Sequence, residues 1–335
     1  MTKRPTILDV ARHAGVSKST VSLVLQNSPS VKNSTRIAVE EAMAKIGYVY
    51  NRSAAGLRGA SSGLIGLVIN DLRNPFFTEF AASVQMTFAE KGFATVVANT
   101  DEDPTLQANV IASMIEHGVN AFVISPTYAN DKTVFDRLER SGIPTMQVLR
   151  QVDERTDVFP FFSLDYQTGS RLAARHLAEM GCENIAFVGG LEDRPVTLER
   201  VSGYDELMEA EQRRKTYFYG RPSRAFGRNI ARRIAKDQNR PDGLICFSDL
   251  VALGMISGFA ETGIQPGKDV RIIGFDDIEE SSLCYPRLST IRCDVSSFGK
   301  SAADALLGWL EKGSKPEAVK RYPVELIVRQ STLQF

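Results

Sequence analysis

Short polar side chains and a lysine are clustered at Ser17, Lys18, Ser19 and Thr20. Hydroxyl and ammonium groups donate hydrogen bonds to phosphate oxygens and to base edges. Residues 1–60 contain nine Lys or Arg and three acidic residues, a formal charge of about +6. Because the 335-residue chain has 40 basic and 40 acidic residues, the remainder carries about −6. A basic N-terminal region on an acidic body predicts a polyanionic partner bound at that end.

Two short helices joined by a tight turn are predicted over residues 6–27 to position this cluster. Thr6 and Asp9 have the spacing of a capping box, Gly15 suits the turn, and Ser17 can cap the second helix. The apolar faces are Val10, Ala11 and Ala14, then Val21, Val24 and Leu25. This spacing is typical of a helix-turn-helix, whose second helix enters the DNA major groove. An ordinary helical hairpin is the alternative, and the charge and polar cluster favour DNA binding.

A third helix is predicted from Ser34 or Thr35 to a stop at Gly47. Residues 48–62 then become small and polar, which a plain linker explains. The segments TILDVARHAGVSKSTVSLVL and GYVYNRSAAGLRG together resemble the DNA-binding head of the LacI/GalR family of bacterial transcription regulators. The resemblance implies that residues 51–58 form a hinge helix in the minor groove, where Leu57 is wedged between base pairs.

The same resemblance assigns roles to individual side chains of the head. Lys18, Ser19 and Leu23 match positions that reach base edges, and other polar groups match positions that hold phosphates. The DNA-contact residues assigned in this way are Thr6, Ser17, Lys18, Ser19, Thr20, Ser22, Leu23, Asn27, Asn51, Arg52 and Leu57.

From Gly63 onward, short apolar runs alternate with helical patterns. Such alternation predicts parallel sheets covered by helices on both faces, here in two sets and therefore two lobes. Strands are predicted at 64–70, 94–98, 121–125 and 144–149, then at 161–165, 185–189, 215–219, 243–247 and 270–275, with a last one at 324–329. Helices are predicted near 76–91, 105–117, 131–141, 167–180, 197–212, 249–262 and 295–311.

The body resembles the periplasmic-binding-protein fold, in which the chain crosses three times between lobes. The predicted architecture is an all-α helix-turn-helix head on an α/β body of two parallel-sheet lobes. Its parts are a head at 1–50, a hinge at 51–62 and a body at 63–335. Lobe 1 takes about 63–160 and 294–321, and lobe 2 takes about 163–290 and 324–335, with crossings near 160–163, 290–294 and 320–324.

Ligands of such folds bind where the carboxyl ends of strands meet. Arg200 in an R-x-x-G pattern and Asp276 in IIGFDD match effector-binding positions of the family, and an ion pair between the two is the alternative. Phe76 and Phe77 are suited to stacking on a sugar ring or to the core. The assigned effector residues are Asn74, Phe76, Phe77, Arg150, Arg194, Arg200, Ser248 and Asp276.

The implied effector is a sugar or a sugar derivative. Many sugar-binding relatives have Asp-Arg where this chain has Leu149-Arg150, so a hydroxyl acceptor is missing at that position. An arginine without its acid favours an acidic or phosphorylated ligand.

Catalytic and metal-binding patterns are missing from the sequence. There is no G-x-G-x-x-G after the first strand, no phosphate-binding G-x-x-x-x-G-K-[ST] and no G-x-S-x-G elbow between a strand and a helix. His13, His117 and His176 stand apart and are expected at the surface or at helix caps. The cysteines have no metal-ligand spacing and are expected as buried free thiols: Cys182, Cys246, Cys284 and Cys293. We therefore expect no enzyme activity, no cofactor and no metal.

The predicted function is a dimeric transcription regulator, a repressor, that binds double-stranded operator DNA and is controlled by a small effector between its lobes. No leader and no apolar run of about 20 residues is found, so a cytoplasmic location without membrane contact is expected. No heptad pattern ends the chain, so a coiled-coil tetramer is not expected. One alternative is a small-molecule binding protein, which has no use for a basic head. The other is a sugar-processing enzyme, which needs an acid–base pair.

Overall fold

The computed structural model describes residues 5–25, 28–49, 62–128 and 132–333. The chain divides into two compact units, Met1–Ser62 and Gly63–Phe335. Among the described residues, no helix is long and apolar enough to cross a membrane.

The first unit contains three helices, α1 (Ile7–Ala14), α2 (Lys18–Leu25) and α3 (Asn33–Ile46). The predicted capping box is confirmed, since the Thr6 N–H donates to the Asp9 carboxylate at 2.9 Å. Gly15 ends α1 with a φ of 65°, a conformation that costs glycine little. Ser17 Oγ accepts the Thr20 N–H at 3.1 Å and so caps α2. Helix α3 begins before both predicted starts, with Lys32 rather than Ser34 or Thr35 leading into it.

Small apolar side chains hold these three helices together. The core of the unit consists of Val10, Ala11, Val21, Val24, Val39 and Ala42. Small residues let the helix axes approach closely. Only Val21 and Val24 of α2 are buried in this core, so the opposite face of α2 is exposed to solvent.

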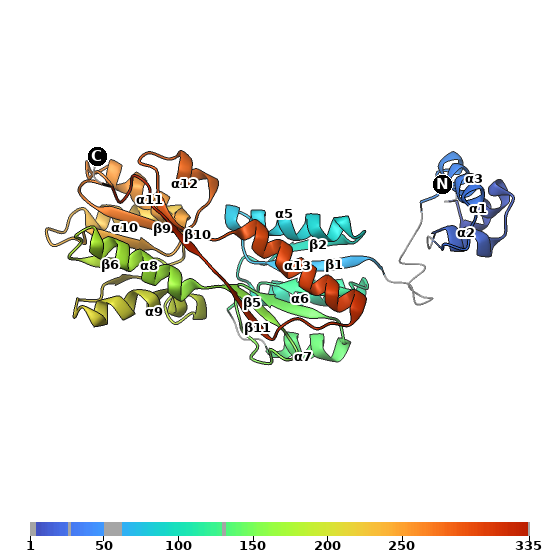
Figure 1. Cartoon of the computed structure of the whole chain (residues 1–335), viewed down its shortest axis with the longest axis horizontal. Helices are drawn as coiled ribbons and strands as arrows, with labels where there is room; N and C mark the ends of the chain where they lie inside the picture. The colour runs from blue at the N-terminus through green and yellow to red at the C-terminus, as the bar shows by residue number, and fades with distance from the viewer. Residues whose placement is uncertain (1–4, 26–27, 50–61, 129–131, 334–335) are drawn as a thin grey trace. The chain divides into compact units, whose positions relative to one another are not determined.

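The second unit holds two six-stranded sheets (Figure 1). The first sheet is parallel throughout, in the order β11-β5-β4-β3-β1-β2. Its strands are β1 (Leu64–Ile69), β2 (Ala94–Asn99), β3 (Ala121–Ile124), β4 (Thr145–Val148), β5 (Phe161–Leu164) and β11 (Val319–Tyr322). Helices α5 (Pro75–Glu90) and α13 (Val295–Lys312) cover one face, and α6 (Pro104–Glu116) and α7 (Lys132–Ser141) the other.

The period-two alternation of β1 explains this sandwich. Ile65, Leu67 and Ile69 pack in the core on the α5 side, whereas Val68 packs in the core on the α6 side. A strand buried on both faces reads as a continuous apolar run, which is what LIGLVI is. We call this sheet with its four helices the first lobe.

The second lobe repeats the plan with the order β12-β10-β9-β8-β6-β7, in which only the β10–β12 pair is antiparallel. Its strands are β6 (Ile185–Val188), β7 (Tyr217–Phe218), β8 (Gly243–Cys246), β9 (Arg271–Asp276), β10 (Ser289–Arg292) and β12 (Glu325–Ile327). Its helices are α8 (Tyr166–Glu179), α9 (Pro195–Ala210), α10 (Arg224–Ile234), α11 (Asp249–Ala260) and the short α12 (Glu279–Leu283). Helices α8 and α9 pair with each other, as do α10 and α11.

The fold class is confirmed, and every predicted element of the body lies within two residues of its expected ends. One assignment to a lobe is wrong. Strand β5 was expected to open the second lobe, but Phe161 and Phe162 pair with β4 of the first sheet. The chain therefore crosses at Asp165, the N-cap of α8, and not at 160–163. It returns between β10 and α13 and crosses a third time between β11 and β12.

Four elements were not predicted: α10, α12, β10 and β11. Helix α10 is rich in arginine and buries few residues, so its apolar face is too narrow to give a clear helical pattern in the sequence. A Cβ on Gly227 would lie 2.1 Å from the Val251 carbonyl oxygen, so glycine is what allows α10 to lie against α11. His176 was expected at the surface or at a helix cap, and this expectation is wrong. Its ring is buried, and Nε2 lies 3.0 Å from Thr332 Oγ1. All four cysteines are free thiols, three of them buried and Cys284 half-buried.

Candidate functional site

Helix α2 presents an exposed, DNA-compatible face. Lys18 and Ser19 are exposed, and Leu23 is 40% exposed although it is apolar. Ser19 and Leu23 are four residues apart and therefore lie on the same side of the helix. Thr20 and Ser22 are half-buried beside them. Asn27, Asn51, Arg52 and Leu57 lie outside the described residues, so their roles remain predictions.

Two other predicted contact residues are engaged locally. Thr6 Oγ1 donates to Asp9 at 2.7 Å, and Ser17 Oγ lies 2.7 Å from Ser19 Oγ and 2.9 Å from Thr20 Oγ1. Both side chains therefore fix helix starts. Their remaining hydrogen-bonding capacity is at the exposed surface, where a phosphate oxygen can be reached.

A cavity of about 260 Å³ lies between the two lobes of the second unit, at the carboxyl ends of the strands. Both sheets contribute the loops that follow their strands, as expected for this architecture. Seven of the eight predicted effector residues line it: Asn74, Phe76, Phe77, Arg150, Arg200, Ser248 and Asp276. Arg194 does not line it, but its guanidinium lies 5.6 Å from the ring centre of Tyr128, which does.

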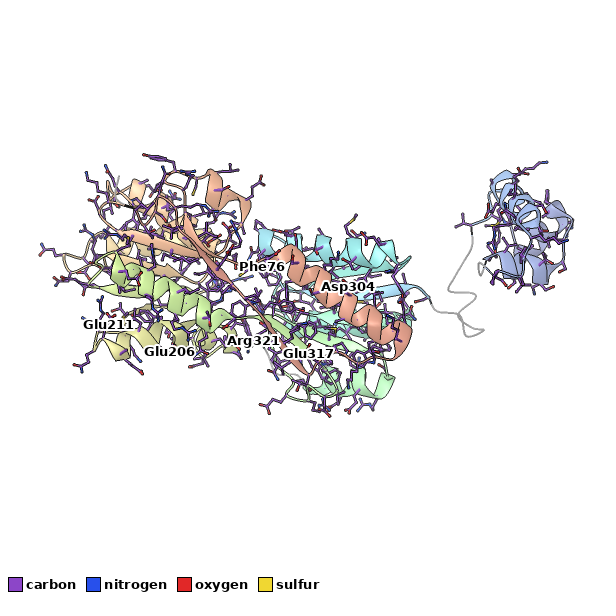
Figure 2. All side chains as sticks on the ribbon, in the orientation of Figure 1. Phe76, Glu206, Glu211, Asp304, Glu317 and Arg321 are labelled. Carbon is purple, nitrogen blue, oxygen red and sulfur yellow. The ribbon has the colours of Figure 1, made fainter. Side chains whose placement is uncertain are left out.

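The segment after β1 builds one wall. The Asn74 side chain accepts the Phe76 N–H at 3.1 Å and so caps α5. Phe76 and Phe77 meet edge to face with ring centres 5.4 Å apart. Both belong to the core of the lobe and both line the cavity, so each of the two interpretations of this pair holds in part. Phe76 is labelled in Figure 2, at the end of α5 that faces the second lobe.

Arg200 is the buried cation of the cavity, with 4% of its surface exposed. Its guanidinium carbon lies 3.9 Å from the ring centre of Phe275, 4.4 Å from that of Phe247 and 4.5 Å from that of Tyr166. Such ring faces attract a cation. One terminal nitrogen donates to the Phe247 carbonyl oxygen, and the other lies 3.8 Å from Asp276 Oδ1.

Asp276 is buried next to Arg200, and the two form the ion pair that was the alternative to effector binding. Both residues nevertheless line the cavity. Burial raises the pKa of Asp276 well above its usual value, and the positive charge of Arg200 opposes that rise. Within the described part of the chain, Arg200 Nε and Ser248 Oγ have no hydrogen-bond partner. The buried donors of this region are therefore not all used by the protein itself.

Arg150 does have an acid, contrary to the expectation. Its Nη1 lies 2.6 Å from Oε1 of Glu102, which follows β2, and its guanidinium lies 4.1 Å from the ring centre of Tyr128. Leu149 is buried among apolar side chains. The acid thus comes from a loop distant in sequence, and the premise that favoured an acidic or phosphorylated ligand is wrong.

Several lining residues were not predicted, among them Asp71, Glu102, Tyr128, Arg221 and Phe247. They lie in the loops that follow strands, Phe247 directly after β8 and Glu102 three residues after β2, so the strand-end rule could have found them. Among the described residues, two ion pairs join the lobes. Arg221 Nη2 lies 2.5 Å from Asp101 Oδ1, and Arg321 of β11 holds Glu199 of α9 at 2.6 Å. Figure 2 labels Arg321 where the lobes meet.

Asp249 supports the loop that carries Asp276. It is fully buried and accepts hydrogen bonds from Ile278 N at 3.0 Å, Ser281 Oγ at 2.7 Å and Thr290 Oγ1 at 2.6 Å. Burial raises its pKa to about 6, because removal from water outweighs these three hydrogen bonds.

This shift gives a pH-dependent stability. The folded pKa of about 6 lies above the ordinary 3.8, so the folded chain keeps a proton that the unfolded chain releases. The stabilisation is fully present below pH 3.8 and is lost as the pH rises through 6. Between pH 4 and 7, the free energy of unfolding of the wild type should fall by about 2 kcal/mol relative to Asp249→Asn.

Urea unfolding of both proteins across this pH range measures the difference. Asp304→Asn, a change at an exposed position of α13, is the matched control and should follow the wild-type curve. If the difference in the free energy of unfolding between wild type and Asp249→Asn does not change with pH, the raised pKa of Asp249 is contradicted.

Comparisons with known proteins agree with these two sites. Residues 6–51 match the family model for bacterial regulatory proteins of the lacI family, and residues 174–332 match a periplasmic binding protein-like domain. The ribose operon repressor of Halalkalibacterium halodurans is 30% identical over 98% of this chain and 97% of its own length. Catabolite control protein A of Priestia megaterium is 28% identical over 98% of this chain and 99% of its own length. The solved Lac repressor dimer bound to operator and the anti-inducer ONPF superposes with a TM-score of 0.87 at 27% identity, over 99% of this chain and 100% of that one.

Proposed function

The chain belongs to the LacI family of bacterial regulatory proteins, and from this premise we propose that its cleft binds a neutral, monosaccharide-sized effector. As a member of the family it is a DNA-binding repressor under effector control and not an enzyme. The observation that carries the proposal is the charge balance of the cavity wall. Three guanidinium groups and three carboxylates line it among the described residues: Arg150, Arg200, Arg221, Asp71, Glu102 and Asp276.

A sugar fits this wall better than an anion does. Each hydroxyl of a sugar both donates and accepts a hydrogen bond, so paired donors and acceptors suit it, while Phe76 offers an apolar ring. An effector phosphate needs an uncompensated cation, but Arg150 and Arg200 each face a carboxylate. The volume of about 260 Å³ lies just below the usual range of ligand cavities, roughly 300–1,000 Å³, which favours one sugar ring over an oligosaccharide.

A thermal-shift screen of the full chain tests the proposal with neutral pentoses and hexoses, sugar phosphates and sugar acids. A ligand at 100 times its dissociation constant stabilises the folded state by about 2.7 kcal/mol, which is readily detected. We expect the neutral sugars to include the ligand that raises the melting temperature most. A response to phosphates or acids alone would overturn the proposal.

For the DNA-binding unit, we propose that Lys18, Ser19 and Leu23 contact base edges while Thr6, Ser17, Thr20, Ser22 and Asn27 contact the backbone. The exposure of Lys18, Ser19 and Leu23 on α2 supports this assignment. Asn51, Arg52 and Leu57 are proposed to enter the minor groove and to kink the duplex there. A two-fold dimer then requires a pseudopalindromic operator.

We propose that the working form is a homodimer, as the related Lac repressor is on its operator. Both lobes carry exposed apolar side chains for such a contact. In the second lobe, Leu283 is 73% and Tyr285 is 87% exposed, and in the first lobe Met86 is 59% exposed. Exposed apolar groups that adjoin one another, as Leu283 and Tyr285 do in the sequence, are typical of protein interfaces, whereas single ones are ordinary at a surface.

Leu283→Glu is therefore expected to raise the dimer dissociation constant at least about 10-fold, because it buries a charge in the contact. Sedimentation equilibrium of the whole chain measures this. Leu198→Glu makes the same substitution at another exposed leucine, on α9, and should leave the dimer intact. Equal effects of both variants would argue against Leu283 as an interface residue.

A further inference from the structure

Glu102 has one carboxylate oxygen that the protein does not use. Oε1 pairs with Arg150 Nη1 at 2.6 Å. Oε2 is buried and, among the described residues, accepts no hydrogen bond. The residue lines the cavity, and its side chain is 28% exposed while that of Arg150 is 13% exposed. A buried carboxylate oxygen without a donor is costly, so a position that retains one requires an explanation.

The backbone of this loop is held in an unusual conformation that brings Glu102 to the cavity. Asp101 has a φ of 47° and Glu102 a φ of 65°, which are left-handed values on two consecutive residues that are not glycine. Each costs free energy, and such residues persist where surrounding contacts enforce them, often at functional sites. Asp101 accepts from Arg73 at 2.6 Å and from Arg221 at 2.5 Å, and Asp103 caps α6 by accepting the Thr105 N–H at 2.8 Å. Contacts on both sides thus fix the loop.

The orientation of the carboxylate is fixed as well. The guanidinium of Arg150 lies 4.1 Å from the ring centre of Tyr128 while it holds Oε1. Because the same guanidinium contacts both Tyr128 and Glu102, Glu102 cannot turn away without breaking a partly buried ion pair. Oε2 is therefore a fixed hydrogen-bond acceptor at the cavity wall.

We propose that Glu102 Oε2 accepts a hydrogen bond from one hydroxyl of the effector and so determines which sugar is bound. This inference rests on the proposed function, in which the cleft takes a neutral sugar. A hydroxyl at this point supplies the missing donor, whereas a sugar without it leaves a buried charged oxygen unpaired. Sites built to pair with a hydroxyl reject ligands that lack it far more strongly than apolar pockets do.

The test compares a sugar with its own monodeoxy analogues by calorimetry on the full chain. The probes are D-ribose, D-xylose, D-glucose and D-galactose, and for each one that binds, a set of analogues lacking one hydroxyl each. Wild-type protein should bind the sugar about 10- to 150-fold more tightly than one of its analogues. In Glu102→Gln, Arg150 retains the amide oxygen, so the NH2 group replaces Oε2. The ratio of the affinity for the sugar to the affinity for that analogue should then fall below about 10-fold.

Asp103→Asn is the matched control, since it removes a carboxylate one residue away that does not line the cavity, and asparagine still caps a helix. Its affinities and its ratio should equal those of the wild type. If Glu102→Gln weakens the sugar and every analogue equally, Glu102 has only a structural role and the inference is overturned. If no probe binds the wild type, the proposed monosaccharide effector fails first and the inference fails with it.

Discussion

Arg200→Met should abolish effector binding and should also lower the free energy of unfolding of the body by about 3–5 kcal/mol. The guanidinium is enclosed by the rings of Tyr166, Phe247 and Phe275 and is the cation nearest to buried Asp276. Methionine keeps much of the length and the apolar contact. It leaves the Asp276 carboxylate without its partner charge in a site where burial already raises the pKa of that carboxyl.

The double variant Arg200→Met/Asp276→Asn separates stability from binding. Because no unpaired buried charge remains in it, most of the lost stability should return. Sugar binding should not return, since the guanidinium is missing from the cavity and the carboxylate is replaced by an uncharged amide. Urea unfolding gives the stability, and calorimetry with the sugar identified in the screen gives the affinity. Wild-type affinity in either variant would remove Arg200 from the site.

Removing residues 1–62 should lower the affinity for DNA by at least about 1,000-fold at physiological salt. The nine basic residues at 1–60 are the counterpart of the phosphate backbone, and the rest of the chain carries an opposite net charge. For the full chain, the logarithm of the binding constant should fall steeply with the logarithm of salt concentration, and this dependence should disappear with the first unit. Fluorescence anisotropy with a labelled duplex measures both.

The body alone is a fair comparison because Gly63–Phe335 is a compact unit with its own sheets and cores. Its affinity for the sugar should match that of the full chain within a factor of about 3. DNA binding that persists in the truncated chain with the same salt dependence would place the nucleic-acid site elsewhere.

Local patterns in the sequence were sufficient for much of the fold. The capping pair Thr6 and Asp9, the glycine at position 15 and the apolar run at 64–69 act within a few residues of themselves, so each is legible without tertiary structure. Strand β5 shows where this fails. Its apolar sequence fits either sheet, and only its pairing with β4 and β11 decides between them.

The cavity shows the same division. Strand-end positions and the family resemblance placed Arg200 and Asp276 at the site, and the structure brings them within 3.8 Å. The partner of Arg150 was missed because Glu102 is 48 residues away and reaches it only through a left-handed turn. A sequence pattern does not indicate that turn, since residues other than glycine adopt such values in only a few per cent of cases. The expected acidic ligand was therefore inferred from an arginine that is already neutralised.

The central claim is that filling the cleft changes how tightly the first unit holds DNA. The most direct test first selects a high-affinity duplex from random DNA with the full chain. The affinity for that duplex is then measured at fixed salt, with and without a saturating concentration of the sugar found in the screen. The account predicts a 5- to 150-fold change in the dissociation constant, which corresponds to about 1–3 kcal/mol of coupling. An unchanged affinity for DNA, with the sugar demonstrably bound, would contradict it.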